Sequence, residues 1–276
     1  MKDDIANTKA LERAERGRDE IRRRRSGLLD RRRIIHGVPA TGTVNRTASE
    51  DQTGTVFASM VITPGRGDDV LIDGANNCKI GGDVLVGRLK GAAIRQLSLE
   101  ERRTCPATCI HWRTCYGNSM HLAKRWRHGP DLEREIRRQV PILLRKRPLL
   151  VRLHVLGDFY SLEYLRMWVE LLDAHPDLSV FGFTAWAKGT PIGDAVARVR
   201  AAMPDQFAIR TSGQTGPWGS WTIDWPTEKR FVRINGDAGM VCPEQRDAMN
   251  SGKRAKHCGN CAACWQSDVP VVFIEH

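Results

Sequence analysis

The sequence predicts an α/β protein built on a partial, barrel-like (βα) parallel sheet of about six strands. Two observations carry this prediction. From residue 92 onward, short apolar runs alternate with segments whose apolar residues recur at helical spacing. Strands separated by helices in this way form parallel sheets, either open or curled. With 276 residues, 41% of them hydrophobic, the chain is long enough to bury a full core.

The predicted strands of this sheet are short apolar runs. They are residues 92–99, 148–156, 178–186, 207–211, 229–234 and 269–274. Two earlier runs, residues 55–63 and 69–73, are expected to pair as a hairpin across Pro64-Gly65.

Helices are expected between the strands. Residues 121–128 and 131–144 have helical character, and in the second Asp131 is a possible cap and Pro141 is expected to kink or end the helix. Ser161 is expected to cap a helix that stops before Pro176. Thr190-Pro191 opens the next helix.

The N-terminal region differs in composition from the rest. Residues 1–52 are expected to form a basic, weakly structured arm and linker, and residues 53–276 a single α/β domain. The first 36 residues hold twelve Lys and Arg against seven Asp and Glu, in a chain of net charge +11. Such a balance favours contact with DNA or RNA; the alternative is a solvated tail.

No signal-peptide core and no run of about 18 apolar residues is present, so we expect a cytoplasmic protein without a membrane partner. Disulfides are rare in that compartment, and clustered cysteines there are typically ligands or redox groups. Seven of the eight cysteines fall into two sets.

The first set, Cys105, Cys109 and Cys115, has the spacing C-x3-C-x5-C in a predicted loop between a strand and a helix. Four-iron clusters normally take four thiolates, so three leave one coordination position exchangeable. An exchangeable position implies chemistry at the metal. The alternative is a closed structural site that recruits a fourth ligand, with His111 and Cys78 as candidates.

The second set is Cys242, Cys258, Cys261 and Cys264, with spacing C-x15-C-x2-C-x2-C. Two residues between cysteines let both sulfurs face one metal. Four thiolates predict a metal site, holding a 4Fe-4S cluster or zinc. The predicted metal-binding loops are therefore residues 105–115 and 242–264.

A turn at the carboxyl end of the strand 148–156 is the third candidate. Ligands of parallel sheets bind at that edge. His154 is a candidate acid, base or hydrogen-bond donor, Gly157 allows close backbone approach, and Asp158 is a candidate acceptor for an ammonium or ribose hydroxyl. Three residues ending the next two strands are expected to line the same mouth: Thr184, Arg210 and Ser212. The alternative for all of them is packing and turn geometry.

The order of motifs resembles that of a known family. CPATC-x5-CY, RLHVLGDFYSLEYLRMW, FTAW, CPEQR, CGNCAACW and VVFIEH occur in the order seen in the phage "gene product 88" domain family, over roughly residues 75–276. The resemblance implies an origin in a phage or mobile element.

More remotely, the layout is similar to the radical SAM superfamily. There a three-cysteine loop holds a four-iron cluster, S-adenosylmethionine chelates its open iron, and a turn after the second strand contacts the methionine moiety. The resemblance assigns Cys105, Cys109 and Cys115 to the cluster and Gly157-Asp158 to that turn. The usual loop is C-x3-C-x2-C with an aromatic residue before the last cysteine, whereas here the spacing is longer and Tyr116 follows.

Three functional hypotheses follow. The first is a radical-SAM-like iron–sulfur enzyme that needs an electron donor and acts on an unknown, possibly nucleic-acid, substrate. The second is a non-catalytic nucleic-acid-binding protein whose basic arm tracks phosphates. In the third, zinc at both sites only stabilises the fold.

Overall fold

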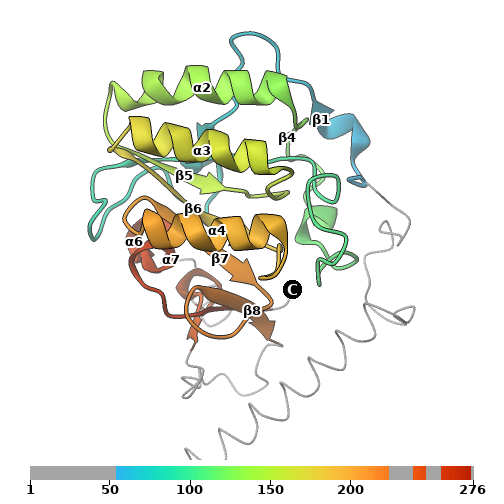
Figure 1. The fold of residues 1–276 in the computed structure, drawn as a ribbon, viewed down its shortest axis with the longest axis vertical. Coiled ribbons are helices and arrows are strands. Elements are labelled where there is room, and N and C mark those ends of the chain that lie inside the picture. Colours follow the sequence, from blue (N-terminus) through green and yellow to red (C-terminus); the bar gives the residue numbers. More distant parts are fainter. Residues whose placement is uncertain (1–53, 224–238, 247–255, 275–276) are drawn as a thin grey trace, which may run out of the picture.

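The computed structural model describes residues 54–223, 239–246 and 256–274. Its centre is an eight-stranded mixed sheet with the order β2-β3-β5-β6-β7-β8-β10-β9 (Figure 1). The strands are β2 (Ile72–Asp73), β3 (Ala93–Gln96), β5 (Leu149–Leu153), β6 (Leu178–Thr184), β7 (Phe207–Ser212), β8 (Gly219–Ile223), β9 (Met240–Val241) and β10 (Val271–Ile274).

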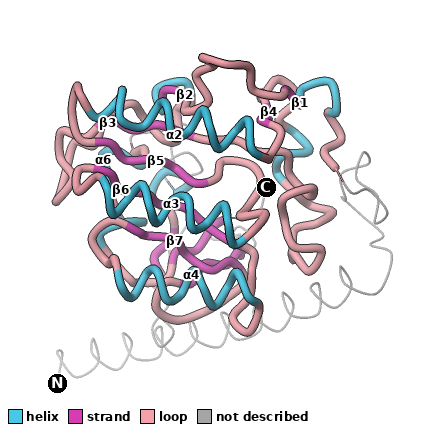
Figure 2. The backbone as a smooth tube through the Cα atoms, turned by 45° about the horizontal axis from the view of Figure 1, so that its top comes forward, coloured by secondary structure: helices cyan, strands magenta, loops and turns pink. Residues whose placement is uncertain are grey.

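Within this sheet β2 runs antiparallel to β3, and every other neighbouring pair is parallel. The strands β3, β5, β6, β7 and β8 lie side by side in the sheet in the same order as in the sequence. The helices α2 (Pro130–Leu144), α3 (Leu162–Ala174) and α4 (Pro191–Ala202) all cover one face (Figures 1 and 2). The prediction of an α/β fold is confirmed, with a mixed sheet in which all neighbouring pairs except β2 and β3 are parallel.

The finer prediction of a six-stranded, partly barrel-like sheet is corrected. The sheet has eight strands among the described residues, and its two edge strands, β2 and β9, pair with one neighbour each. An open sheet results because β2, at one edge, is antiparallel and two residues long, so it offers no parallel edge for closure.

The main core lies between the sheet and these helices. Strand alternation sends Leu149, Val151 and Leu153 of β5 into it. Helical periodicity brings Leu132 and Ile136 of α2 to the same layer, where both are fully buried.

The opposite face, called here the inner face, carries a second apolar cluster. Leu150, Phe181 and Ala208 point into it from β5, β6 and β7. The short C-terminal helices α6 (Cys258–Cys261) and α7 (Ala263–Gln266) cover it, and Trp265 packs on Phe181 with ring centroids 4.7 Å apart.

The capping predictions for Ser161 and Thr190 are confirmed. The hydroxyl of Ser161 accepts from the Tyr164 amide at 3.0 Å at the start of α3. The hydroxyl of Thr190 accepts from the Gly193 amide at 3.1 Å at the start of α4. Both helices begin where a side-chain oxygen satisfies an otherwise unpaired amide.

The predicted N-terminal hairpin is wrong. Residues 58–60 form a 3-10 turn, and only β1 (Val61–Ile62) is extended, paired in parallel with β4 (Arg125–Trp126). β2 pairs with β3 instead. A β-branched run becomes strand only where a partner edge is available, and that edge comes from residues far along the chain.

The helix predicted at residues 121–128 is also wrong, because the segment ends in the strand β4. Arg125 is buried in an ion pair with Glu101, and the Trp126 indole donates to the Val70 carbonyl at 3.1 Å. Leu122, which a helix would have to bury, is 80% exposed. Tertiary contacts therefore override helix propensity here.

Pro141 does not end its helix. α2 continues to Leu144, with Gly129 at the N-cap and Pro130 at the first position, so Asp131 lies in the first turn rather than at the cap. Pro141 lies in the last turn and removes one backbone donor there, but the helix continues past it, because the Arg145 amide donates to the Pro141 carbonyl at 3.3 Å. Val140, before Pro141, is fully buried, and Leu143, after it, packs against the same core.

Several predictions lie outside the described residues, namely the basic arm, the linker and the strand at 229–234. The sequence analysis also missed β8 and β9, which are too short or too polar for a strand signal. Among the described helices, none combines the length and apolar character needed to cross a membrane.

Candidate functional site

The carboxyl ends of β3, β5, β6 and β7 meet at one edge of the sheet, because these strands are parallel. The segment with the first cysteine set leaves β3 and passes over this edge (Figure 1). The Leu99 amide donates to the Leu156 carbonyl at 2.9 Å. A side chain added at Gly213, after β7, would meet Ile110 at 3.2 Å. The first cysteine loop therefore lies beside the carboxyl ends of these strands.

Cys105, Cys109 and Cys115 lie close enough for their charges to act on one another. Burial is the main cause that raises the pKa of each thiol, and it brings the pKa of Cys109 to about 12. Neighbouring cysteines of the set raise the pKa values of Cys105 and Cys109 further. Without a cation these thiols stay protonated at neutral pH, and a bound metal would displace their protons.

Backbone amides point at the sulfurs of this set. The amides of Arg102, His111 and Gly117 donate to Cys105, Cys109 and Cys115 respectively, and each hydrogen bond lowers the thiol pKa. Hydrogen bonds to sulfur favour the thiolate and tune a metal centre bound to it.

Asp158 ties the loop to the strand ends. One carboxylate oxygen accepts from the Phe159 amide and the Thr184 hydroxyl, both at 2.8 Å, and the other accepts from the Ala185 amide at 2.6 Å. Its own amide donates to the Thr104 hydroxyl at 3.1 Å, one residue before Cys105. Burial raises its pKa to about 7, while these hydrogen bonds act in the opposite direction.

Gly157 lets the same turn approach the loop. Its φ is +81°, and an added side chain would lie 2.6 Å from both the Leu99 side chain and the Thr104 hydroxyl. The geometry accounts for glycine by packing against protein. A role for Gly157 and Asp158 toward S-adenosylmethionine stays a prediction.

His154 lies in the helix-covered core. Its Nε2 is 3.0 Å from the Tyr164 hydroxyl, and its Nδ1 is buried with no hydrogen-bond partner among the described residues. Burial, with the charge of Arg152 adding to it, lowers its pKa to about 3. His154 is therefore neutral at physiological pH, and proton transfer by it stays a prediction.

Thr184 and Ser212 end β6 and β7 at the predicted edge. Thr184 is buried and its hydroxyl donates to Asp158, which is in turn bonded to Thr104 of the first loop. Ser212 is half-buried opposite Ser220 of β8. Their contact with a cofactor stays a prediction.

The second cysteine set lies on the inner face. Cys258 and Cys264 pack against its apolar cluster. The Cys258 amide donates to the Lys79 carbonyl at 2.9 Å, and the Cys242 amide to the Val272 carbonyl at 2.8 Å. Segments far apart in sequence thus converge here.

The four thiols of this set also affect one another. Burial raises the pKa of Cys242 to about 12 and raises those of Cys258 and Cys264. Cys264 raises the pKa of Cys242, and Cys261 raises those of Cys258 and Cys264. The four cysteines are therefore gathered on the inner face, and the metal that their spacing predicts stays a prediction.

Arg210 is fully buried and holds the C-terminal segment. Its guanidinium donates to the carbonyls of Cys264 at 3.2 Å, Ala263 at 3.3 Å and Val269 at 2.8 Å, and also to Ser267. The sequence placed it at the mouth of the sheet, and the structure directs it to α7. Its role as a cofactor ligand stays a prediction.

Neither cysteine set is tight around a single point. In residues 54–223, 239–246 and 256–274, no three His, Cys, Asp or Glu side chains are grouped as one metal ion requires. The two other candidate ligands differ in place: His111 lies inside the first loop with Nδ1 3.5 Å from the Thr114 hydroxyl. Cys78 is exposed and precedes Lys79, which bonds to the second set.

Three arginines near the cysteines were not among the predicted site residues. Arg125 binds Glu101 through two hydrogen bonds of 2.8 and 3.0 Å and donates to three carbonyls in the chain that follows the first loop. Arg102 is buried and lowers the pKa values of Cys109 and Cys115. Arg152 interrupts an otherwise apolar buried strand, which was the one available signal.

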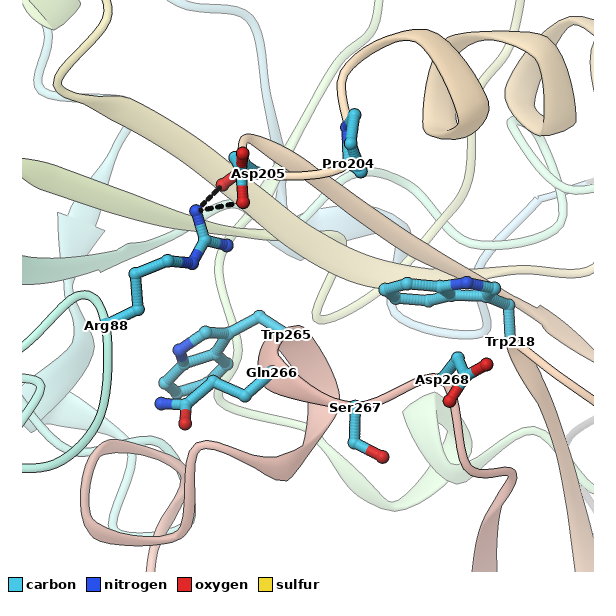
Figure 3. Close-up of a pocket in the computed structure, with 8 residues that line it drawn as sticks. All are labelled: Arg88, Pro204, Asp205, Trp218, Trp265, Gln266, Ser267 and Asp268. Carbon is cyan, nitrogen blue, oxygen red and sulfur yellow. Dashed lines mark hydrogen bonds and ion pairs between the residues drawn. The ribbon is translucent and has the colours of Figure 1, made fainter.

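A shallow pocket of about 280 Å³ lies elsewhere (Figure 3). Trp218 and Trp265 line it, and Arg88 reaches across to Asp205 with a 3.0 Å ion pair. Pro204 and Asp205 lie at the amino end of β7, whereas Trp218 lies beside the carboxyl half of β7, because the next residue, Gly219, pairs with Thr211.

The sequence model of a protein family described as Gene product 88 matches residues 70–267, a span that includes both cysteine sets. No curated protein and no solved structure matches the chain.

Proposed function

This chain belongs to the gene product 88 family, and from the two cysteine sets within the matched region we propose that it is an iron–sulfur protein. One four-iron cluster would be held by Cys105, Cys109 and Cys115, and a second by the C-terminal set. The single observation that carries the proposal is that each set is gathered, with half-buried thiols within range of one another's charges.

The surroundings of the sulfurs fit a cluster. Backbone amides donate to all three sulfurs of the first set, and the amides of Glu244 and Gln245 donate to Cys242. Each thiolate of a four-iron cluster binds a different iron atom, so its ligands surround a larger body than one ion. Cysteines that face one another without converging on a point are compatible with that requirement.

The unequal ligand counts suggest unequal roles. Four thiolates close the C-terminal centre, whereas three leave one position at the first centre for a small molecule. We assign this position to S-adenosylmethionine, by the resemblance to radical SAM enzymes. One-electron reduction of its sulfonium by an external donor would break the C5′–S bond, giving methionine and a radical that takes a hydrogen atom from the substrate.

The protein's own contribution at this site would be positioning. Asp158 and Thr184 fix the turn beneath the loop, and Thr104 connects that turn to Cys105. The carboxyl edge of the sheet is where a ligand beside the open position would lie. The substrate class that we favour is nucleic acid, on the chain's net charge of +11 and the phage or mobile-element character of the family.

The test is anaerobic purification followed by iron, zinc and sulfide analysis and an absorbance scan near 400 nm. Wild type is expected to hold about eight irons, and Cys105→Ala/Cys109→Ala/Cys115→Ala about four. A matched control is Cys78→Ala, which should keep the wild-type content. Colourless protein with one or two zincs would overturn the iron proposal.

The reaction is tested separately on loaded protein. With a strong reductant, wild type is expected to convert S-adenosylmethionine to 5′-deoxyadenosine and methionine, and the triple variant to produce neither. Loaded wild type that does not bind S-adenosylmethionine would overturn the reaction while leaving the clusters intact.

A second candidate function is nucleic-acid binding without catalysis, favoured by the five excess positive charges in the first 36 residues. Each phosphate neutralised releases counterions, so affinity would fall steeply with salt. Deleting residues 1–36 should weaken binding to both DNA and RNA at low salt and reduce the salt dependence. Binding that is absent, or that is unchanged by salt and by the deletion, would overturn this candidate.

A further inference from the structure

Two guanidinium groups occupy the inner face beside the C-terminal cysteines. In the sheet register Arg152 of β5 is opposite Phe181 of β6, and Phe183 is opposite Arg210 of β7. Since side chains two residues apart on a strand share a face, these four residues lie on the same side of three adjacent strands.

The guanidinium of Arg210 has hydrogen-bond partners, but among the described residues it has no ion-pair partner. Its hydrogen-bond partners are backbone carbonyls. The negative groups that act on its pKa are Cys264 and Asp268. A buried positive charge of this kind is costly unless an anion lies nearby.

Arg152 is less satisfied still. Its guanidinium lies over the rings of Phe183 and Phe181, at 4.6 and 5.4 Å from their centroids. Its Nη1 is buried without a hydrogen-bond partner, and the described residues contain no ion pair to it. Aromatic faces attract a cation but do not replace hydrogen bonds or a counter-charge.

The thiols of Cys258 and Cys264 can supply negative charge near Arg152 when they are ionised. Cys258 and Cys264 pack against the same apolar cluster that contains Phe181. The positive charge of Arg152 lowers the pKa of both thiols, and that of Arg210 lowers the pKa of Cys264. On the other side, Arg152 also acts on Tyr116 of the first loop.

We propose that Arg152 is the charge partner of the centre held by Cys242, Cys258, Cys261 and Cys264, and that its free Nη1 donates to a thiolate sulfur there. The inference rests on the proposed function for the presence of that centre. A metal centre with a core charge of +2 and four thiolate ligands has a net charge of −2. The two positive charges of Arg152 and Arg210 would balance it. Arg152 is therefore a positioning and tuning residue rather than a catalytic one.

The consequence is a raised reduction potential of the C-terminal centre. One-electron reduction adds a negative charge, and a nearby cation stabilises the reduced form. Net charge and hydrogen bonds to sulfur are the quantities that set such potentials. Removing the Arg152 charge is expected to shift the ratio of reduced to oxidised centre at least tenfold toward oxidised, which is 59 mV for one electron.

The experiment is an anaerobic redox titration of the full chain followed by electron paramagnetic resonance. Arg152→Gln and Arg152→Met both remove the charge, and Met suits the aromatic neighbours if the Gln variant does not fold. Arg152→Lys keeps the charge and should restore most of the potential. The matched control is Arg137→Gln, which removes an exposed charge on the helix-covered face, where Arg137 pairs with Glu170 at 2.7 Å.

Comparison with the Cys105→Ala/Cys109→Ala/Cys115→Ala protein assigns the two potentials. A lowered potential of the C-terminal centre in both neutral variants, with Arg137→Gln unchanged, supports the inference. Wild-type potentials in folded, loaded neutral variants overturn it.

The failure of the proposed function has a different appearance, because metal and sulfide analysis of the same samples would then find zinc instead of iron. In that event the inference is tested by chelator competition. The neutral variants should lose zinc at a chelator concentration at least tenfold lower than wild type, because a zinc–thiolate centre carries the same negative charge. Equal retention overturns the inference there too.

Discussion

At the scale of single residues, burial displaces two groups at the end of β5 in opposite directions. It raises the pKa of Asp158 to about 7 and lowers that of His154 to about 3. Both shifts disfavour charge in the interior. They oppose each other in their effect on stability as the pH changes, so variants are needed to separate them.

The prediction for His154 follows from its lowered pKa. In the unfolded chain the pKa is about 6.5, so between pH 6.5 and about 3 the unfolded state binds a proton that the folded state does not. The free energy of unfolding therefore loses up to about 1.4 kcal/mol per pH unit as the pH falls in this window. In His154→Gln this loss should be absent.

Urea unfolding of wild type and His154→Gln between pH 5 and 7.5 measures this pH-dependent loss of unfolding free energy. The stability advantage of wild type should shrink as the pH falls below 6.5. Tyr164→Phe is the matched control, since it removes the hydrogen-bond partner but keeps the buried imidazole, and its pH dependence should follow wild type. A difference between wild type and His154→Gln that does not vary with pH contradicts the prediction.

Asp158 has the opposite sign. Its folded pKa exceeds the usual value of about 3.9, so the stability associated with its protonated form is complete below that value and is lost as the pH rises through about 7. Thr184→Val removes one hydrogen bond that favours the ionised form and should raise this pKa further. The pKa is measured by carboxyl titration with nuclear magnetic resonance, and an unchanged or lowered value in Thr184→Val contradicts the prediction.

At the scale of elements, the first cysteine loop is held by a buried ion pair rather than by regular structure. Arg125 is fully buried, and Glu101 also accepts from the Thr55 hydroxyl at 2.6 Å. Through the carbonyls of Gly117, Met120 and Ala123, Arg125 fixes the chain that follows Cys115. Removing one member of such a pair leaves an uncompensated buried charge.

We therefore predict that Arg125→Met destabilises the protein by about 3–5 kcal/mol and empties the first metal site before the second. Adding Glu101→Gln should recover part of the stability, because it removes the unpaired carboxylate. Urea unfolding and metal analysis of the single and double variants measure both effects. Equal loss of metal from the two sites would show that the pair does not act on the loop.

The elements also show where sequence reasoning succeeds. α3 and α4 were predictable because their caps and apolar spacing are local. The segment ending in β4 was mistaken for a helix because the decisive contacts of Arg125 and Trp126 are with residues far along the chain. The spacing of the cysteines led to the expectation that each set gathers, and the metal at each set stays a prediction. Arg152 was not placed beside the C-terminal set, because only the parallel register puts it on the inner face.

At the scale of the whole molecule, different parts of the chain cover the two faces of the sheet. The helices α2, α3 and α4 cover one face, and the segment with Cys258 and Cys264 covers the other (Figure 1). This segment is bound to parts of the chain that are far apart in sequence. The carbonyls of Lys79 and Ile80 accept from its amides, and the Arg210 guanidinium donates to its carbonyls. The metal that we propose for this segment is therefore expected to contribute to global stability.

The centre that we propose at the first cysteine set differs, because its cysteines lie in a local loop at the edge of the sheet and its removal leaves both faces covered. Cys258→Ala/Cys261→Ala/Cys264→Ala should therefore lower the melting temperature more than Cys105→Ala/Cys109→Ala/Cys115→Ala. It should also bind the dye ANS, because loss of the segment exposes the apolar cluster around Leu150, Phe181 and Ala208.

Calorimetry and dye fluorescence on anaerobically purified proteins measure the two effects, with metal content determined on each sample. Chelation of the wild type should reproduce the behaviour of the C-terminal variant, since metal binding free energy is folding free energy where a site joins distant segments. A larger loss of stability from the first set would place the structural burden at the edge of the sheet instead. The inner face would then be held by its apolar contacts and by Arg210 alone.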